Sequence, residues 1–301
     1  MFELYNYNNW KINRTVKKIK GELPLFLSRG GLVMPILNMK DYQEYKKEYL
    51  KIGVEILKNI GISPTLKIIT DGEDKRTETY MKSKLKLAKE LGLVAEKIVV
   101  NSVEELDEAM SKDSRCICQL PIKKELENYY MANIKQTIDV DGFADYDNVF
   151  NDSYNLIPAT PKGIIEHIEF LDYNLRGKNV VILGRGNLVG KPLSILMMNK
   201  GATVSVLNSK TDEQLRKTLL LTADIVVCAT GVIGSVKASE LSNDKQVLVY
   251  NVGTCFKDGK LTTELEVDID KENIYYTDRI GAVGVCTVLG LMDNVINSYL
   301  F

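Results

Sequence analysis

Two residues that could position a ring and transfer a proton lie four positions apart in the first half of the chain. Tyr80 and Lys84 fall on one face of a helix if their segment is helical. A phenol beside an amine can hold a planar ring and carry a proton, provided that burial lowers the pKa of the lysine. The spacing also fits a solvated helix face, because other lysines surround Lys84 at positions 82, 86 and 89.

Two further groups of polar residues stand where turns are expected. Gln119-Leu-Pro121 lies at the C-terminal end of a predicted strand at residues 115–120, where active-site residues tend to collect. Asp139-Val-Asp141-Gly142 carries two carboxylates in a sequence typical of a turn. Asp-Gly turns are also common as plain structure.

A glycine-rich turn in the second half joins a predicted strand to a predicted helix. Residues 179–183, four of them apolar, form the predicted strand. Gly184-Arg-Gly-Asn-Leu-Val-Gly190 follows, and residues 191–198 have a helical pattern. Glycines let the backbone approach a pyrophosphate, and a helix N-terminus offers N–H groups and a positive dipole end. The motif favours a dinucleotide site. Its G-x-G-x-x-x-G spacing is one residue longer than the usual fingerprint, and such turns also occur without a ligand.

The end of the next predicted strand, at residues 201–207, bears on the choice of cofactor. In sites that prefer NAD, an acid there accepts hydrogen bonds from the ribose 2′-hydroxyl. Here the four residues are Asn208-Ser-Lys-Thr211, none of them acidic, and Arg185 lies in the glycine loop. Basic and hydroxyl groups suit a 2′-phosphate, which favours NADP and leaves NAD possible. The alternative is that Lys210 is solvated and unrelated to any ligand.

Strands and helices alternate along the chain, so we predict an α/β fold of two α/β domains. In the first half, periodicity predicts helices at 41–60 and 78–91 and strands at 65–70, 97–101 and 115–120. In the second half, apolar runs at 223–229 and 246–250 are typical of buried parallel strands. Thr230-Gly231 and Gly253 follow these runs, at the sheet edge where ligands bind. The first 33 or so residues lack this alternation and receive no role.

Composition excludes several classes of protein. A chain of 301 residues can form two domains, and a net charge of −1 does not indicate nucleic acid or a membrane surface as a partner. No apolar run approaches the ~20 residues of a membrane span, and the N-terminus lacks a secretion-signal pattern. Five cysteines without metal-ligand spacing favour reduced thiols, no metal and a cytoplasmic location. His167, the single histidine, is expected to be structural.

The order of these motifs resembles the methylenetetrahydrofolate dehydrogenase/cyclohydrolase family over about residues 40–301. The matching motifs are Tyr80-x-x-x-Lys84, Gln119-Leu-Pro121, Asp139-Val-Asp-Gly-Phe143, Pro158-Ala-Thr-Pro-Lys-Gly163, Gly184-Arg-Gly-Asn-Leu-Val-Gly-Lys-Pro192, Asn208-Ser-Lys-Thr211 and Ala229-Thr-Gly231. Seven motifs in order are far more specific than any one of them. The resemblance implies two α/β domains flanking a cleft: a folate-binding catalytic domain at 1–157 plus 288–301, and a Rossmann-type NAD(P)-binding domain at 158–287. It also implies a homodimer that pairs through the nucleotide domain.

The same resemblance implies an activity and a set of site residues. The protein would oxidise 5,10-methylenetetrahydrofolate to 5,10-methenyltetrahydrofolate with NADP, and would then hydrolyse the product to 10-formyltetrahydrofolate. Lys84 would transfer protons in the hydrolysis, Tyr80 would pack against the folate ring, Gln119 would hold the lysine, and Asp141 would bind the aminopyrimidine edge. Asp139, two residues before Asp141, could instead cap the turn. The implied folate contacts also include Leu120 and Pro121. The implied cofactor contacts are Gly184, Arg185, Gly186, Asn187, Val189, Gly190, Ser209, Thr230, Gly231, Gly253 and Thr287.

The chain departs from the family pattern mainly near its C-terminus. Relatives have a Pro-Gly-Gly-Val-Gly-Pro-Met-Thr loop where this chain has Ile280-Gly-Ala-Val-Gly-Val-Cys-Thr287, so both prolines are replaced. Ile138, Ala159 and Gly186 also stand in place of the usual Lys, Cys and Ser. Two alternatives therefore stay open. One is a dehydrogenase of single activity in which Lys84 is idle, and the other is a folate- or nucleotide-binding protein without activity.

Overall fold

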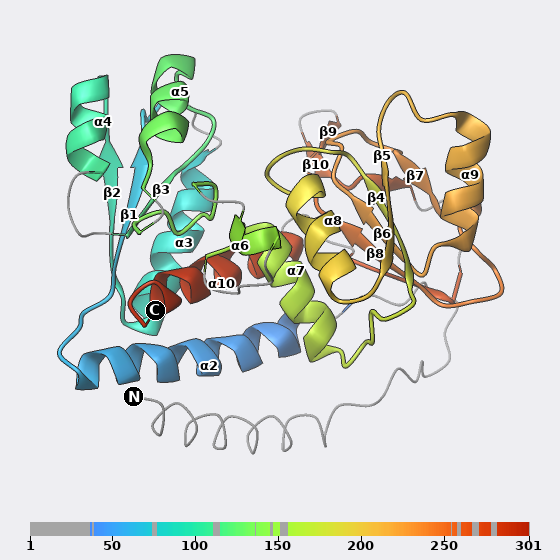
Figure 1. Cartoon of the computed structure of the whole chain (residues 1–301), viewed down its shortest axis with the longest axis horizontal. Coiled ribbons are helices and arrows are strands. Elements are labelled where there is room, and N and C mark those ends of the chain that lie inside the picture. Colours follow the sequence, from blue (N-terminus) through green and yellow to red (C-terminus); the bar gives the residue numbers. More distant parts are fainter. Residues whose placement is uncertain are drawn as a thin grey trace.

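Two parallel sheets occupy opposite ends of the molecule, with the crossing of two helices between them (Figure 1). The computed structural model describes residue 37 and residues 39–73, 77–110, 115–135, 137–144, 147–150, 156–253, 255–257, 260–266, 271–277 and 282–300. The N-terminal segment without an assigned role (residues 1–33) and the first two residues of the altered loop, Ile280 and Gly281, lie outside this part of the chain. The predicted α/β fold with two α/β domains is confirmed.

The first sheet has the strand order β2 (Val94–Val99), β1 (Thr65–Thr70), β3 (Arg115–Cys118). Helix α3 (Thr77–Leu91) connects β1 to β2, α4 (Val103–Met110) connects β2 to β3, and α5 (Lys124–Asn133) follows. Alternate residues of β1 face opposite sides of the sheet. Leu66 and Ile68 pack into the core shared with the long helices, and Ile69 packs into the core under α4 and α5. Both faces of the central strand are therefore buried, as parallel sheets require.

Strand β2 begins at Val94, three residues before the predicted start. Its parallel register with β1 runs from Thr65 opposite Val94 to Thr70 opposite Val99. Because β2 is an edge strand with Val94 and Val99 exposed, its sequence lacks the apolar run that marks a buried strand. The prediction for β3 was also too long, since the strand ends at Cys118.

The second sheet has the order β12 (Ile274–Tyr276), β8 (Val247–Asn251), β6 (Ile225–Cys228), β4 (Asn179–Leu183), β5 (Thr203–Leu207), all parallel. Helix α8 (Gly190–Asn199) connects β4 to β5, and α9 (Glu213–Thr222) leads from β5 to β6. Every residue of β6 and β8 is buried, so the predicted double-sided burial is confirmed. The chain moves to one side of β4 and then to the other. The strand order therefore reverses between β4 and β6, which is where doubly wound sheets bind ligands.

Apart from three long helices, the remaining elements among the described residues are short. They are α6 (Asp147–Phe150), β7 (Val236–Lys237), a turn of 3-10 helix at Ala238–Glu240, β9 (Cys255–Lys257), β10 (Lys260–Thr262) and β11 (Leu265–Glu266). Strands β9 and β10 form an antiparallel pair, and β11 pairs with β7.

Three long helices join the two halves: α2 (Met39–Asn59), α7 (Ala159–Phe170) and α10 (Ala282–Asn297) (Figure 1). Helices α7 and α10 cross at two glycines. A β-carbon on Gly163 would lie 2.2 Å from the carbonyl oxygen of Cys286, and one on Gly290 would lie 2.5 Å from that of Ala159. Such distances are below van der Waals contact, so only glycine permits this approach. Helix α10 begins at Ala282, six residues before the expected return of the chain to the first domain at 288, and its first turns bury Val283 and Cys286.

His167 lies inside this helical region and behaves as predicted. It is fully buried on α7, its Nδ1 lies 2.8 Å from the Tyr250 hydroxyl, and its ring meets Tyr42 edge to face. Along the described residues, no helix combines the length and apolar character needed to cross a membrane.

Asp139 shapes the turn that follows the first sheet. Residues 138–140 lie beside β3, where Cys116 N donates to Ile138 O (2.8 Å) and Val140 N donates to Cys116 O (3.3 Å). The buried Asp139 carboxylate then accepts hydrogen bonds from four consecutive backbone N–H groups. These are the backbone N–H groups of residues 141 (2.9 Å), 142 (3.1 Å), 143 (2.6 Å) and 144 (2.6 Å). The prediction that Asp139 caps the turn is confirmed.

We expect Asp139→Ala to destabilise the protein by about 3 kcal/mol or more, because four backbone donors lose a charged acceptor at a buried site. Urea unfolding measures this loss. Asp141→Ala is the matched control, because the four backbone hydrogen bonds to Asp139 do not involve the Asp141 side chain. Equal losses of stability in the two variants would contradict the assignment.

Candidate functional site

Helix α3 and the end of strand β3 bring Lys84 and Gln119 together. Lys84 Nζ donates to Gln119 Oε1 at 2.8 Å, and Gln119 Nε2 donates in turn to Leu120 O at 3.1 Å. Burial lowers the pKa of Lys84, against the opposing influence of Asp141 and Cys118. Other lysines of α3, at positions 82, 86 and 89, are exposed. Lys84 therefore differs from the exposed lysines of α3, because it is partly buried and bonded to Gln119.

Asp141 lies near this lysine at the same edge of the sheet. Burial raises the pKa of Asp141 to about 6, Lys84 opposes the shift, and Asp139 adds to it. The turn packs closely against the segment that precedes α7: Gly142 has φ +79°, and a β-carbon there would lie 2.5 Å from the carbonyl carbon of Ile157. Side chains from three separate segments therefore converge on one partly desolvated position.

The other predicted folate contacts lie on the same segments. Tyr80 stands one helical turn before Lys84 on α3 and is 43% exposed, so its ring offers an uncovered apolar surface. Leu120 is half-buried, Pro121 is exposed, and the peptide bond between them is cis.

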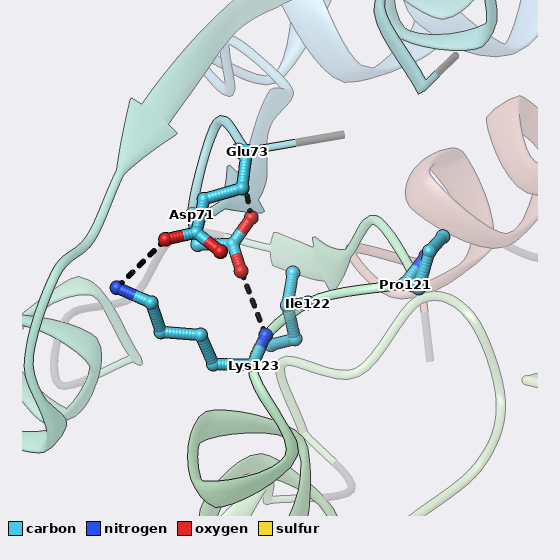
Figure 2. A pocket seen from close by; sticks show the side chains of 5 residues that line it. All are labelled: Asp71, Glu73, Pro121, Ile122 and Lys123. Atoms are coloured by element: carbon cyan, nitrogen blue, oxygen red, sulfur yellow. Dashed lines mark hydrogen bonds and ion pairs between the residues drawn. The ribbon is translucent and has the colours of Figure 1, made fainter. Parts of the chain in front are cut away.

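A surface pocket of about 230 Å³ adjoins these residues and shares Pro121 with them (Figure 2). Lys123 crosses it: its backbone N donates to Asp71 Oδ2 at 2.7 Å, and its Nζ pairs with Glu73 at 3.0 Å. These contacts tie the loop after β1 to the segment after β3. The pocket is lined by Asp71, Glu73, Pro121, Ile122 and Lys123, and does not include the Lys84–Gln119 pair. We therefore assign it a structural role beside the candidate site.

The glycine loop between β4 and α8 packs against other backbone at Gly184 and Gly190 and is open at Gly186. Gly184 has φ +103°, and a β-carbon there would lie 2.2 Å from Ala229 O of the loop after β6. A β-carbon on Gly190 would lie 2.0 Å from Gly184 O, whereas one on Gly186 would meet no atom within 4 Å. The exposed stretch from Arg185 to Asn187 then leads through half-buried Val189 into a helix start without a side-chain cap. This is the geometry that a pyrophosphate requires.

The turn after β5 leaves a basic and a hydroxyl side chain exposed. Ser209 and Lys210 are exposed, and the Asn208 side chain accepts a hydrogen bond from Lys210 N at 2.9 Å. The first acid beyond the strand, Asp212, caps helix α9 by accepting from Leu215 N at 3.0 Å. Its carboxylate is therefore engaged in the helix cap, and the basic and hydroxyl side chains remain at the strand end.

Glu264 was not singled out from the sequence, although it holds the loop at Thr230 and Gly231. Its fully buried carboxylate accepts from Thr230 N (3.0 Å), Gly231 N (2.6 Å) and the hydroxyls of Thr230 (2.9 Å) and Ser235 (3.1 Å). Gly253 leaves room for it, since a β-carbon there would lie 1.5 Å from Glu264 Oε1. Glu264 stands among short strands without periodicity, so no pattern in the sequence marks it.

Thr287, the last predicted cofactor contact, lies on α10. Its hydroxyl is 2.8 Å from the Thr160 hydroxyl of α7 and donates to Val283 O at 3.1 Å. The structure thus places it at the crossing of the two helices, and none of these hydrogen bonds reaches the glycine loop.

Comparison with known proteins agrees with this arrangement. Residues 158–300 match the family described as Tetrahydrofolate dehydrogenase/cyclohydrolase, NAD(P)-binding domain. The chain is 32% identical over 279 residues to the Bifunctional protein FolD of Staphylococcus epidermidis, covering 88% of this chain and 96% of that protein. It is 31% identical to the protein of the same name from Campylobacter concisus, covering 87% and 96%.

Solved structures are similar over the whole fold. The bifunctional enzyme FolD from Campylobacter jejuni superposes with a TM-score of 0.80 at 27% identity, covering 88% of this chain and 98% of that one. The Trypanosoma brucei enzyme, solved with an NADP cofactor and an inhibitor, gives a TM-score of 0.79 at 24% identity, covering 89% and 98%, which supports the fold. With relatives above 30% identity along nearly their full length, this chain belongs to the bifunctional methylenetetrahydrofolate dehydrogenase/cyclohydrolase (FolD) family.

Proposed function

We propose that the protein oxidises 5,10-methylenetetrahydrofolate with NADP and hydrolyses the resulting 5,10-methenyltetrahydrofolate to 10-formyltetrahydrofolate, with Lys84, Gln119 and Asp141 at the centre of the folate site. Family membership supports both activities. The observation that carries the residue assignment is the 2.8 Å hydrogen bond between Lys84 and Gln119, with Asp141 beside it and burial shifting the pKa values of both ionisable groups.

Folate binding is assigned to the first half of the chain. The carboxylate of Asp141 accepts two hydrogen bonds from the aminopyrimidine edge, a two-point contact suited to its geometry. The exposed ring of Tyr80 packs against the folate ring system. Leu120 and Pro121 border the site beside Gln119.

The oxidation needs positioning more than acid or base chemistry. When bound, NADP⁺ accepts the hydride that leaves the methylene carbon between N5 and N10, and the folate nitrogens stabilise the cation that forms. Gly184, Gly186 and Gly190 let the backbone approach the pyrophosphate, and the loop at Thr230 and Gly231 borders the same crevice. Arg185, Ser209 and Lys210 suit a 2′-phosphate. The remaining proposed cofactor contacts are Asn187, Val189, Gly253 and Thr287.

The hydrolysis requires proton transfers, and these fall to Lys84. Water adds to the methenyl carbon and loses one proton to give a hydroxyl intermediate. The bond from this carbon to N5 then breaks: the hydroxyl loses its second proton to become the formyl carbonyl, and N5 gains a proton, so one proton is released overall. An amine with a lowered pKa exchanges protons near neutral pH more readily than an ordinary lysine. Gln119 aims the amine through its Oε1 and is itself held by Leu120 O.

Domain limits, assembly and location extend this proposal. We assign folate binding to residues 1–157 plus 288–301 and cofactor binding to 158–287. A homodimer formed through the nucleotide domain is supported by β5, which lies at the edge of the second sheet and could be extended by a second copy. A cytoplasmic location is supported by five buried, unpaired cysteines.

Lys84→Met should reduce methenyltetrahydrofolate hydrolysis by about 10²- to 10⁴-fold while most of the hydride transfer is retained, since only hydrolysis needs the proton carrier. The decay of methenyl absorbance and the formation of NADPH measure the two steps separately. Lys86→Met, an exposed lysine of the same helix, is the matched control. Hydrolysis at a near wild-type rate in Lys84→Met would show that Lys84 is not the proton carrier. Formation of NADPH without methenyl hydrolysis in the unmodified protein would favour a dehydrogenase of single activity. Absence of both activities in the unmodified protein would favour a binding protein.

Folate affinity should fall below pH 6, because protonated Asp141 cannot accept both hydrogen bonds. With a pKa of about 6, the loss of affinity should approach about tenfold per pH unit below that value. Titration of folate between pH 5 and 8 measures this loss. Protein stability changes separately: because the folded-state pKa of Asp141 exceeds the usual 3.8, ionising it costs stability as pH rises from about 4 to 6. In Asp141→Asn the pH dependence of folate affinity should vanish, and its survival would locate the titrating group elsewhere.

Glu264→Gln should weaken NADP binding by about tenfold, because an amide nitrogen would face a backbone donor and disturb the loop at Thr230 and Gly231. Calorimetric titration of NADP gives the comparison. Glu266→Gln, exposed and two residues later, serves as the control. An unchanged NADP affinity in Glu264→Gln would mean that this loop does not contribute to cofactor binding.

A further inference from the structure

A cluster of buried charged groups lies where α2, α7 and α10 meet. Lys46 of α2 contacts Glu166 of α7 at 2.9 Å and Asp293 of α10 at 3.1 Å. Lys162 of α7 contacts Asp293 at 2.5 Å. Two ammonium and two carboxylate groups thus balance one another inside the protein. None of them belongs to the proposed folate or cofactor contacts.

The members of this cluster hold one another in their charged forms. Burial alone would raise the pKa of Asp293, but Lys162 and Lys46 lower it to about 2. Burial would likewise lower the pKa of Lys46, but Asp293 and Glu166 raise it. Desolvation offsets much of the attraction in such a cluster, whereas loss of one partner leaves a buried charge uncompensated. The consequence is a fixed arrangement of the three helices.

Asn294 connects this cluster to the turn that carries Asp141. Its side chain is fully buried, and its Oδ1 accepts from Lys162 Nζ at 2.9 Å. Its Nδ2 donates to Val140 O at 2.9 Å and to Ile157 O at 2.8 Å. Both amide hydrogens are therefore committed, one to the residue before Asp141 and one to the segment that leads into α7.

The same turn is held from its other sides. Val140 N donates to Cys116 O of β3, so residue 140 is fixed between the first sheet and α10. Gly142 packs against Ile157 more closely than any side chain would allow. The backbone on either side of Asp141 thus has few alternative positions while Asn294 is in place.

We propose that Asn294 is a positioning residue for folate binding, which holds the main chain of the Asp141 turn while Lys162 and Asp293 hold Asn294. This inference rests on the proposed role of Asp141 as the acceptor for the aminopyrimidine edge. A two-point contact tolerates little displacement, so loss of the Asn294 bonds weakens folate binding without removing any group that touches folate. The nucleotide loops make none of these contacts, so their affinity for NADP is unaffected.

The test uses Asn294→Asp in the full-length protein, titrated with 5-formyltetrahydrofolate and, separately, with NADP. The substitution keeps the size of the side chain and the oxygen that accepts from Lys162. It replaces the amide nitrogen, which donates to Val140 O and Ile157 O, with an oxygen that cannot donate to them. We expect the folate Kd to rise by about 10- to 100-fold and the NADP Kd to stay within about twofold. In steady state, KM for folate should rise while kcat at saturation changes much less. Lys162→Met, which removes the donor to Asn294, should change the folate Kd in the same direction by a smaller factor.

Leu289→Ala is the matched control, since it removes a fully buried side chain from α10 outside this network. It should lower the melting temperature and leave the folate Kd unchanged. The proposal is overturned if both Asn294→Asp and Lys162→Met bind folate normally. It is also overturned if these variants lose affinity for folate and NADP equally, or if Leu289→Ala loses as much folate affinity as they do. Asp141→Ala separates this result from the wider proposal. If that variant binds folate normally, the assignment of the folate site fails, whereas normal binding in Asn294→Asp alone refutes only the positioning role.

Discussion

A close backbone contact between α7 and α10 determines how the two halves meet. At Gly163 and Gly290, α7 and α10 approach until a β-carbon would lie 2.2 to 2.5 Å from the opposite carbonyl oxygen. Helix α7 leads into β4 and the glycine loop, and α10 carries Asn294 to the back of the folate turn. A larger side chain at either glycine would separate the helices. It would thereby also move the proposed cofactor loop relative to Asp141.

Desolvation acts in opposite directions on the two ionisable groups of the candidate folate site. Burial lowers the pKa of Lys84 and raises that of Asp141, so each group is less strongly held in its charged form than in water. Their mutual attraction limits both shifts. An amine that exchanges protons readily therefore lies beside an acid that titrates near pH 6. The same burial that costs stability here prepares both groups for chemistry.

The nucleotide half uses its acids in a different way. Asp212 caps a helix and Glu264 organises the loop after β6, so both carboxylates serve the backbone. The strand end at Ser209 and Lys210 is left without a competing acid, which is the condition for a 2′-phosphate. Asp139 follows the same principle in the folate half, since its four backbone bonds leave Asp141 as the acid at the site. Neighbouring carboxylates in this protein therefore differ in function because of which donors surround them.

Sequence alone determined the α/β alternation, most strand positions and the principal candidate residues. An apolar run indicates a buried strand and a glycine-rich stretch indicates a turn, and both signals can be read from neighbouring residues alone. Residues 65–70 and 179–183 were predicted to the residue. The edge strand β2 was misplaced, since an exposed strand lacks an apolar run. Tertiary structure decided which lysine of α3 is desolvated and which carboxylate of the 139–141 turn caps it. It also revealed Glu264 and Asn294, whose partners lie 34 and 154 residues away in the chain. The polar pair Asp293–Asn294 does interrupt an apolar helix, which signals buried contacts, but only the fold identifies their partners.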